Sequence, residues 1–294
     1  MRRTSLLLLA LLVFLTSAVT AAEQRAIDVM SFNIRYGTAV DGDNHWDNRE
    51  AQVCEVIRDH SPDVVGLQEA LGFQIDHVLA TVSGYGGIGE GRDGGIAGEY
   101  SAILYRTARF NVSDSGTFWL SDTPGVPSSH WGNACVRICT WARFVDRQSG
   151  QVFYLYNTHL DHQSQPSREK SVRLIVERIR SRAHADPFVL TGDFNAGEDN
   201  PAIRYLAGDG TEADAARPPL LDAFRVLHPD VVEVGTFNGF TGKTDGDKID
   251  YVFVTPETEV LSAEIARTNR EGRYPSDHFP VTARLRFATS PEGE

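Results

Sequence analysis

The chain has 294 residues, of which 41% are hydrophobic and 23% charged, and its formal net charge is −12. This composition excludes a disordered chain and allows one large domain with a substantial core. The acidic balance argues against a broad electrostatic grip on nucleic acid, although a local basic groove is compatible with it.

The N-terminus has the pattern of a secretory signal peptide. Arg2 and Arg3 precede an apolar run over residues 6–15, and small residues follow as far as Ala22. This run is much shorter than the ~20 apolar residues that a membrane-spanning helix needs. We therefore expect residues 1–22 to be removed on export to the periplasm or beyond, leaving a single domain over residues 23–294.

Apolar runs bounded by turn residues predict strands along the whole chain. In chain order these runs cover residues 26–34, 63–67, 102–105, 137–145, 152–157, 188–191, 249–254 and 281–287. Helical periodicity lies between them, over residues 48–59, 72–81 and 167–185. Alternating strands and helices followed by strand-rich stretches predict a layered domain of the α/β or α+β class.

Three cysteines, Cys54, Cys135 and Cys139, do not make a disulfide framework. Cys135 and Cys139 lie on one predicted strand, where four residues span about 13 Å, too far for a disulfide. Their spacing also lacks the companions of a zinc site. We expect buried free thiols.

Polar side chains lie at the ends of six of the predicted strands. In chain order they are Asn33, Glu69, His159, Asp193 with Asn195, Asp250, and Asp277 with His278. A single polar residue at a strand end is usually a turn or cap residue. Turns and caps do not require a glutamate and two histidines, however, and loops at strand ends converge on one rim of a sheet.

This mixture of carboxylates, amides and imidazoles suits hydrolysis at phosphorus with a hard divalent cation. Carboxylate and amide oxygens are the ligands that Mg²⁺ prefers, whereas a zinc site needs more histidines or cysteines. Such hydrolysis requires screening of the phosphate oxygens, alignment of the attacking water and neutralisation of the leaving oxygen.

The same residues resemble the motifs of the endonuclease/exonuclease/phosphatase superfamily. The motifs are SFN, LQE, NTHLDH, GDFN, ID and SDH, and they occur in that superfamily's order over residues 33–278. The resemblance implies an α+β fold, a four-layer αββα sandwich of two packed mixed β-sheets. It places the catalytic site at one edge between the sheets.

The resemblance also implies a metal site. Glu69 matches the principal ligand of Mg²⁺, with Mn²⁺ as a possible substitute. Asn33 and Asp277 match residues near the same cation or its waters.

The remaining motif residues match catalytic groups of the superfamily. Asp193, supported by Asn195, matches the residue that orients or deprotonates the attacking water. Asp250 and His278 match a carboxylate–imidazole pair, and whether Asp193 or His278 takes the water proton stays open.

His159 matches a second imidazole, which binds a phosphate oxygen or protonates the leaving group. In the deoxyribonuclease-like members a glutamate supports this imidazole, and Glu99 is the residue of this sequence in a suitable position.

Candidate substrate-binding residues lie on two loops and one strand. Arg137 suits a bidentate phosphate contact. Phe237 and Asn238 lie on the glycine-rich loop before Asp250, which helps to form the substrate pocket in the superfamily. The stretch DGDNHWDNRE fits no calcium-loop register, and its end has the spacing of a helix cap. We expect His45 and Trp46 to border the pocket.

Our leading hypothesis is an exported, divalent-metal-dependent phosphoesterase. Its substrate would be a phosphodiester or phosphomonoester of a small sugar, a polyol or a lipid-linked group. The alternative is an exported nuclease acting on DNA or RNA. A catalytically silent binding protein on the same fold is disfavoured, because it has no need for so many ionisable groups at one edge.

Overall fold

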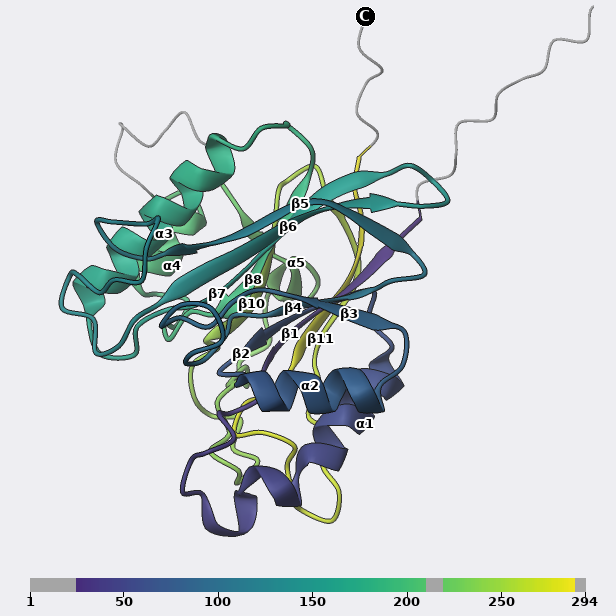
Figure 1. Ribbon diagram of the computed structural model, residues 1–294, viewed down its shortest axis with the longest axis vertical. Helices are drawn as coiled ribbons and strands as arrows, with labels where there is room; N and C mark the ends of the chain where they lie inside the picture. Colours follow the sequence, from purple (N-terminus) through teal and green to yellow (C-terminus); the bar gives the residue numbers. More distant parts are fainter. Residues whose placement is uncertain (1–24, 210–218, 289–294) are drawn as a thin grey trace, which may run out of the picture.

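The computed structural model describes residues 25–209 and 219–288, whose strands form two six-stranded sheets (Figure 1). In spatial order the first sheet contains β11 (Glu259–Ile265), β12 (Val281–Arg286), β1 (Ile27–Asn33), β2 (Val64–Gln68), β4 (Ile103–Arg106) and β3 (Tyr85–Ile88). The second contains β5 (Phe110–Trp119), β6 (Ile138–Asp146), β7 (Val152–His159), β8 (Phe188–Asp193), β10 (Asp250–Val254) and β9 (Leu221–Asp222).

Both sheets are mixed, and each has one parallel strand pair at its centre. These pairs are β1 with β2 and β7 with β8, and the remaining pairs are antiparallel. The register aligns Asn33 with Gln68 and His159 with Asp193, and Asp193 is also aligned with Asp250. The polar strand ends therefore meet at one edge.

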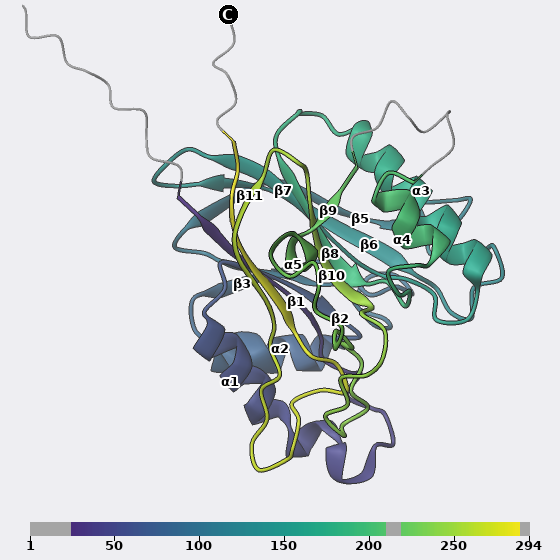
Figure 2. The same cartoon turned by 180° about the vertical axis from the view of Figure 1, so that it is seen from behind.

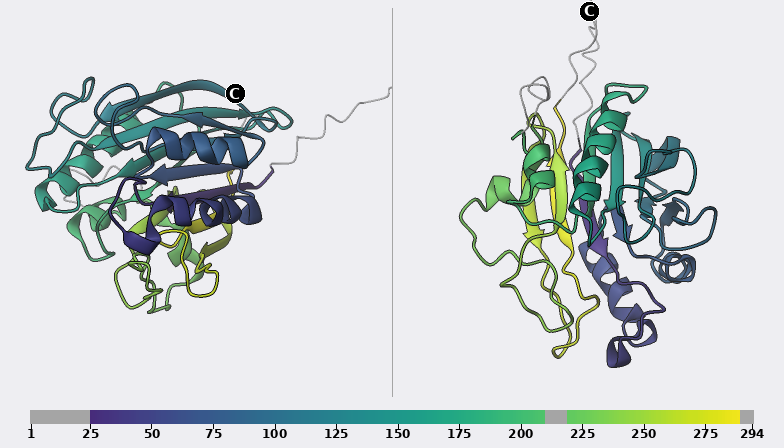
Figure 3. Two further views of the ribbon diagram at one scale, coloured as in Figure 1. Left: turned by 60° about the horizontal axis from the view of Figure 1, so that its bottom comes forward. Right: turned by 90° about the vertical axis from the view of Figure 1, so that its left-hand side faces the viewer.

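Helices cover the outer face of each sheet. Helices α1 (Glu50–His60) and α2 (Gly72–Thr81) lie side by side over the first sheet (Figure 3). Helices α3 (Gln165–Arg180) and α4 (Pro201–Leu206) cover the second sheet (Figure 2), and α5 (Ala223–Leu227) packs against β10 and β11. The predicted four-layer αββα sandwich is confirmed.

Three apolar clusters hold the four layers together. The central cluster joins the facing sides of the two sheets, with residues such as Phe144 and Leu285. The outer clusters join each sheet to its helices. Strands such as β2 and β8 are buried along their whole length, which explains their continuous apolar runs.

The sheets approach each other closely at Gly66, next to a buried polar network. A Cβ atom at this position would lie 2.4 Å from Thr191 Oγ1 and 2.5 Å from Asn157 Oδ1. The same Asn157 oxygen accepts hydrogen bonds from Gln68 Nε2 at 2.7 Å and Thr191 Oγ1 at 3.1 Å. Only glycine leaves room for this polar link between the sheets.

Sequence patterns missed several short or polar elements. These are β3, β5, β9, β11, α4 and α5. Strand β5 has a mostly polar sequence because it is a sheet edge, and a register shift interrupts its pairing. The predicted signal peptide lies outside the described residues. Within the described parts of the chain, no helix is long and apolar enough to cross a bilayer.

Candidate active site

The loops after β1, before β10 and before β12 gather at one end of the molecule, in purple, lime green and yellow at the bottom of Figure 1. A cavity of about 810 Å³ opens among the strand ends. Nine predicted site residues line it: Glu69, Glu99, Arg137, His159, Asp193, Asn195, Phe237, Asp277 and His278. Asn33 and Asp250 lie behind its wall, each hydrogen-bonded to a residue that lines it.

Three residues at this rim turn the chain through the left-handed region. Arg35, Glu69 and Asn195 have φ values of 56°, 59° and 48°. Side chains other than glycine rarely adopt this conformation, which costs about 1 kcal/mol or more per residue. Each of these residues lies just after a strand, so the turn ends the strand and directs its polar side chain toward the cavity.

Asn33 joins the two halves of the site across the sheets. Its Nδ2 donates to Glu69 Oε1 at 3.2 Å and to Asp193 Oδ2 at 2.9 Å. Its Oδ1 accepts the backbone N–H of Arg35 at 2.9 Å. Asn33 therefore positions two carboxylates and presents an amide N–H, rather than its oxygen, to Glu69.

Asp250, His278 and Asp193 form a buried charged series. His278 Nδ1 lies 2.9 Å from Asp250 Oδ2, and its Nε2 lies 3.7 Å from Asp193 Oδ2. Burial alone would lower the pKa of His278, but the two carboxylates raise it well above its usual value. Burial and the charge of Asp250 raise the pKa of Asp193 to about 7. His278 is therefore an imidazolium beside a carboxyl group that exchanges its proton near neutrality.

The second imidazole, His159, has the opposite electrostatic environment. Its Nε2 lies 2.9 Å from Asn195 Nδ2 and 3.4 Å from Asp193 Oδ2. Burial, reinforced by the positive charge of Arg137, lowers the pKa of His159 well below its usual value. His159 is thus neutral, and the cavity contains one charged and one neutral imidazole.

The carboxylates of Glu69 and Asp277 suit a hard divalent cation. Both lie near the guanidinium of Arg35, with nitrogen–oxygen distances of 3.8 and 3.7 Å. Burial raises the pKa of Asp277. Both carboxylates line the same cavity, and a few carboxylate oxygens with several waters are the ligation that Mg²⁺ prefers. The donor set therefore fits a cation held by Glu69 and Asp277.

Comparison with known proteins agrees with this geometry. A model of the Endonuclease/Exonuclease/phosphatase family matches residues 30–278. The chain belongs to the endonuclease/exonuclease/phosphatase family. A solved structure of a family protein from Bacteroides vulgatus is 36% identical with a TM-score of 0.81, and covers 90% of this chain and 100% of its own.

A second bacterial structure and a curated relative extend this comparison. The mannosyl-6-phosphatase of Bacteroides thetaiotaomicron is 32% identical with a TM-score of 0.78, and covers 89% of this chain and 100% of its own. Nocturnin of Drosophila melanogaster is 26% identical and covers 80% of this chain. The chain spans 41–59% of the length of the curated relatives that it matches.

The endonuclease/exonuclease/phosphatase family comprises phosphoric ester hydrolases that depend on a divalent metal ion. The described residues contain two carboxylate–imidazole groupings at the cavity, one with Glu69, His159 and Asp193, the other with Asp193, Asp250 and His278. Asp193 is common to both groupings. Asp193 is therefore the carboxylate of this chain best placed for the chemistry of the family.

Further residues that line the cavity were not predicted as site residues, and they include Arg35, Tyr36, Arg92 and His162. Arg35 follows Asn33 by two positions, so its place after the strand was visible in the sequence. Arg92 lies on a long glycine-rich loop, and no pattern in the sequence indicated that this loop reaches the site.

Glu99 lines the cavity as expected, but its partner differs from the predicted one. Its carboxylate accepts a hydrogen bond from Arg92 Nη1 at 2.8 Å, and no hydrogen bond joins it to His159. The prediction that Glu99 supports His159 is therefore wrong for this structure. Backbone pairing of residues 91–99 brings Arg92 next to Glu99, and an ion pair forms there instead.

His45 and Trp46 do not border the cavity. Trp46 is buried, with its ring 5.9 Å from that of His77 and 5.2 Å from the Arg49 guanidinium, because an apolar ring is better placed in the helix-covered core. His45 accepts a backbone N–H at its own turn. Asp41 of the same stretch contacts a residue that lines the cavity, through two 3.0 Å hydrogen bonds from Arg35.

The predicted helix cap in the same stretch is also wrong. Helix α1 begins after Arg49, and no side chain caps it. Arg49 is buried and donates to the carbonyls of Ile34 at 2.6 Å and Pro275 at 3.0 Å. Burial lowers the pKa of this guanidinium to about 10. Arg49 therefore joins two of the loops that form the cavity.

Asn238 supports the site from behind and does not line the cavity. It is 1% exposed, its Nδ2 donates to the carbonyl of Ser276 at 3.2 Å, and its N–H donates to the carbonyl of Asp277 at 2.7 Å. The neighbouring Phe237 is 50% exposed, and its ring lies 5.2 Å from that of His278. Only Phe237 of this predicted pair is placed to touch a substrate.

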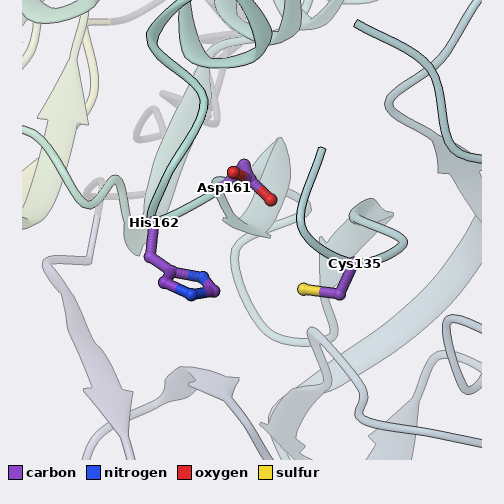
Figure 4. Close-up of side chains that lie close together, drawn as sticks. All are labelled: Cys135, Asp161 and His162. Carbon is purple, nitrogen blue, oxygen red and sulfur yellow. The ribbon is translucent and has the colours of Figure 1, made fainter. Parts of the chain in front are cut away.

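A third group of possible metal ligands consists of Cys135, Asp161 and His162, whose side chains lie close together (Figure 4). Cys135 and His162 line the cavity. This group does not suit a cation. The carboxylate of Asp161 accepts three backbone N–H groups at 2.7–3.0 Å, and the Arg137 guanidinium lies 3.2 Å from His162 Nδ1. Burial raises the pKa of the Cys135 thiol. These residues instead position the guanidinium of Arg137.

Proposed function

We propose that the protein is an exported, Mg²⁺-dependent phosphatase that removes phosphate from a phosphomonoester of a small sugar or polyol. The observation that carries this proposal is the unsatisfied guanidinium of Arg137 in the cavity wall. Arg137 is 4% exposed, its Nε has no hydrogen-bond partner in the described chain, and its nearest carboxylate oxygen, on Asp161, is 4.0 Å away.

A buried guanidinium without a close carboxylate favours a bound anion. Guanidinium forks bind phosphate oxygens in pairs, and the benefit grows with the charge of the phosphate. A monoester has three terminal oxygens and up to two negative charges, whereas a diester has two such oxygens and one charge. Arg92 lines the same cavity and bonds Glu99 through Nη1, so its other guanidinium N–H groups are left for the second charge of a monoester.

The residues around Asp193 supply the proton chemistry. In this proposal Asp193 receives a proton from the attacking water as the new P–O bond forms, because Asn33 and Asn195 fix its two oxygens. The His278 imidazolium donates to a phosphate oxygen and stays charged beside Asp250. The bond between phosphorus and the sugar oxygen breaks, and this oxygen takes a proton from solvent.

A bound Mg²⁺ would supply Lewis-acid screening of the phosphate charge. Glu69 and Asp277 would hold it, and Asn33 would orient Glu69 through its amide N–H. Arg35 adds positive charge at the same place, and Asp41 holds its guanidinium from the far side.

The other wall of the cavity suits a sugar better than a nucleic-acid backbone. Phe237 offers an exposed ring beside His278, and Asp247 adds an exposed carboxylate. A carboxylate accepts hydrogen bonds from sugar hydroxyls but repels neighbouring phosphates of a polymer. The net charge of −12 adds to this repulsion. The likeness to a bacterial mannosyl-6-phosphatase supports the same substrate class.

A phosphate-release screen tests this proposal. Protein lacking residues 1–22 is incubated with Mg²⁺ and mannose 6-phosphate, glucose 6-phosphate, inositol 1-phosphate or phosphocholine, and in parallel with DNA and RNA. We expect the sugar and inositol phosphates to be hydrolysed, and Asp193→Asn to be the inactive blank. Faster cleavage of DNA or RNA that is lost at about 0.2 M salt would instead establish the nuclease function.

Export rests on the N-terminal pattern alone, so it needs its own experiment. N-terminal sequencing of protein from the periplasm or medium should begin near Glu23. Retention of residues 1–22 on protein in the cytoplasm would exclude export.

A further inference from the structure

A second cavity, of about 430 Å³, lies on the outer face of the second sheet, between strands β5–β7 and the C-terminal end of α3. It lies on the side of the sheet opposite the central core. Four aromatic side chains line it: Phe118, Trp141, Tyr154 and Tyr156. Its size lies within the range of small-ligand pockets, about 300–1,000 Å³.

The rings of Trp141, Tyr156 and Tyr154 lie side by side. The rings of Trp141 and Tyr156 are 6.4 Å apart and inclined by 28°, and those of Tyr154 and Tyr156 are 6.1 Å apart and inclined by 21°. Trp141 faces Gly116 of the neighbouring strand, where a Cβ atom would lie 3.1 Å from the indole Nε1. Glycine at this position lets the indole lie close over β5.

The two tyrosine hydroxyls of this cavity have no hydrogen-bond partner among the described residues. Tyr154 and Tyr156 are 1% and 2% exposed, yet neither hydroxyl forms a hydrogen bond to a described residue. Neither hydroxyl oxygen is fully enclosed by protein. Buried tyrosine hydroxyls normally find a partner. The hydroxyls therefore reach the cavity, where solvent or a ligand bonds them.

Charged groups border the same rings. Arg178 lies with its guanidinium 5.6 Å from the Phe118 ring and forms no ion pair with any described residue. Asp114 is exposed on the opposite side, and one of its oxygens accepts the N–H of Ser115 at 2.9 Å. Arg182 also lines the cavity, but its guanidinium donates to the backbone carbonyls of Ile179 and Asp186. The cavity thus combines hydrogen-bond donors, an acceptor and aromatic side chains.

We propose that this second cavity binds a neutral hexose residue of a glycan, stacked on Trp141 and hydrogen-bonded by Arg178, Asp114 and the two tyrosine hydroxyls. A sugar ring has an apolar face bordered by hydroxyl groups that both donate and accept, which matches this lining. A lipid chain would leave the polar atoms unpaired, and an anion would lie near Asp114 with only Arg178 free to pair with it, because Arg182 is bonded to backbone carbonyls. Binding requires no hydrolysis, so it is independent of the chemistry proposed at Asp193.

Calorimetric titration with mannobiose, cellobiose and maltotriose tests the proposal. We expect at least one sugar to bind the wild type with a dissociation constant in the millimolar range, below about 10 mM. Trp141→Ala should weaken binding at least about tenfold, the equivalent of 1.4 kcal/mol. Arg178→Gln and the double change Tyr154→Phe with Tyr156→Phe should weaken it severalfold while keeping the aromatic surface.

Matched controls separate this cavity from the active site and from general damage. Asp193→Asn and Phe73→Ala, which removes an exposed ring on α2, should bind the sugar like the wild type. Thermal unfolding shows whether each variant is folded. If Trp141→Ala does not fold, the binding measured for Arg178→Gln decides the proposal. Absence of binding by the wild type to all three sugars would overturn the proposal. Unchanged binding by folded Trp141→Ala and Arg178→Gln would overturn it as well.

Discussion

Buried carboxylates lie where the two sheets meet at both ends of the molecule, but the side chains next to them differ. At the end opposite the active site, Arg109 donates to Asp146 at 2.8 Å and also bonds Asp63, which joins the sheets. At the active-site end, Asp193 and Asp277 have no comparably close guanidinium. Arginine bonds both carboxylates directly at the structural end, whereas no guanidinium lies within hydrogen-bonding distance of Asp193 or Asp277.

The pKa shifts express this difference. Burial alone would raise the pKa of Asp146, but hydrogen bonds from Arg109 and from two backbone N–H groups lower it. Burial raises the pKa of Asp193 to about 7 and also raises that of Asp277. Structural ion pairs stabilise the charged form, whereas catalytic sites keep carboxyl groups that bind protons or metal ions readily. The end with Asp146 is therefore structural, and the end with Asp193 and Asp277 is reactive.

The largest expected effect is the loss of activity in Asp193→Asn. An amide cannot accept the proton of the attacking water, so kcat/KM for a sugar phosphate should fall about 10³-fold or more. The melting temperature in EDTA should stay constant or rise, because a buried charge has been removed. Activity within tenfold of the wild type would show that the reactive end is assigned wrongly.

Arg109→Met should have the converse effect at the structural end. It leaves the Asp146 carboxylate buried without its guanidinium, which should lower the free energy of unfolding by about 3–5 kcal/mol. Urea unfolding measures this loss, and kcat/KM per folded molecule should be unchanged. The double variant with Asp146→Asn should recover part of the stability. A fall in activity with no loss of stability would contradict the comparison.

Metal removal should affect the active-site end through Glu69 and Asp277. EDTA should abolish hydrolysis, and Mg²⁺ should restore it. Mg²⁺ at a hundredfold excess over its Kd should raise the stability of the folded state by about 2.7 kcal/mol, seen as a higher melting temperature. Glu69→Gln should lose most of this shift, whereas Glu55→Gln on the surface of α1 should keep it.

The smallest effect concerns acid pH at the structural end. Because the folded-state pKa of Asp146 is lowered, its contribution to stability is present above the unfolded pKa and is lost as pH falls through the folded pKa. Wild type should therefore lose more stability than Asp146→Asn between about pH 5 and pH 3, by on the order of 1 kcal/mol. Parallel stability curves for the two proteins would contradict this assignment.

Much of the fold followed from sequence because its central strands are buried on both faces. Strands such as β2 and β8 have continuous apolar runs that no helix of the same length would show. Strand β5 escaped prediction because an edge strand keeps polar residues, and β3 because two of its four residues are glycine. Edge strands depend on their neighbours for pairing, and local sequence does not report those neighbours.

Some residues of the site could also be predicted from the local sequence, and others depend on tertiary contacts. Glu69, Asp193 and His278 follow or precede buried strands, so their convergence was predictable from strand ends. The surroundings of Trp46 depend on a residue far away in the sequence, and those of Glu99 depend on how its own loop folds back on itself. Burial of Trp46 against His77, and pairing of Glu99 with Arg92, arise only when these segments meet.

The most direct test of the proposed phosphatase is a comparison of mannose 6-phosphate with its methyl diester as substrates in Mg²⁺. Wild type should have the higher kcat/KM for the monoester, and Arg137→Met should reduce this preference about tenfold or more, because a charged hydrogen bond contributes about 1.5–3 kcal/mol. An equal or higher kcat/KM for the diester in the wild type would contradict a site built for phosphomonoesters.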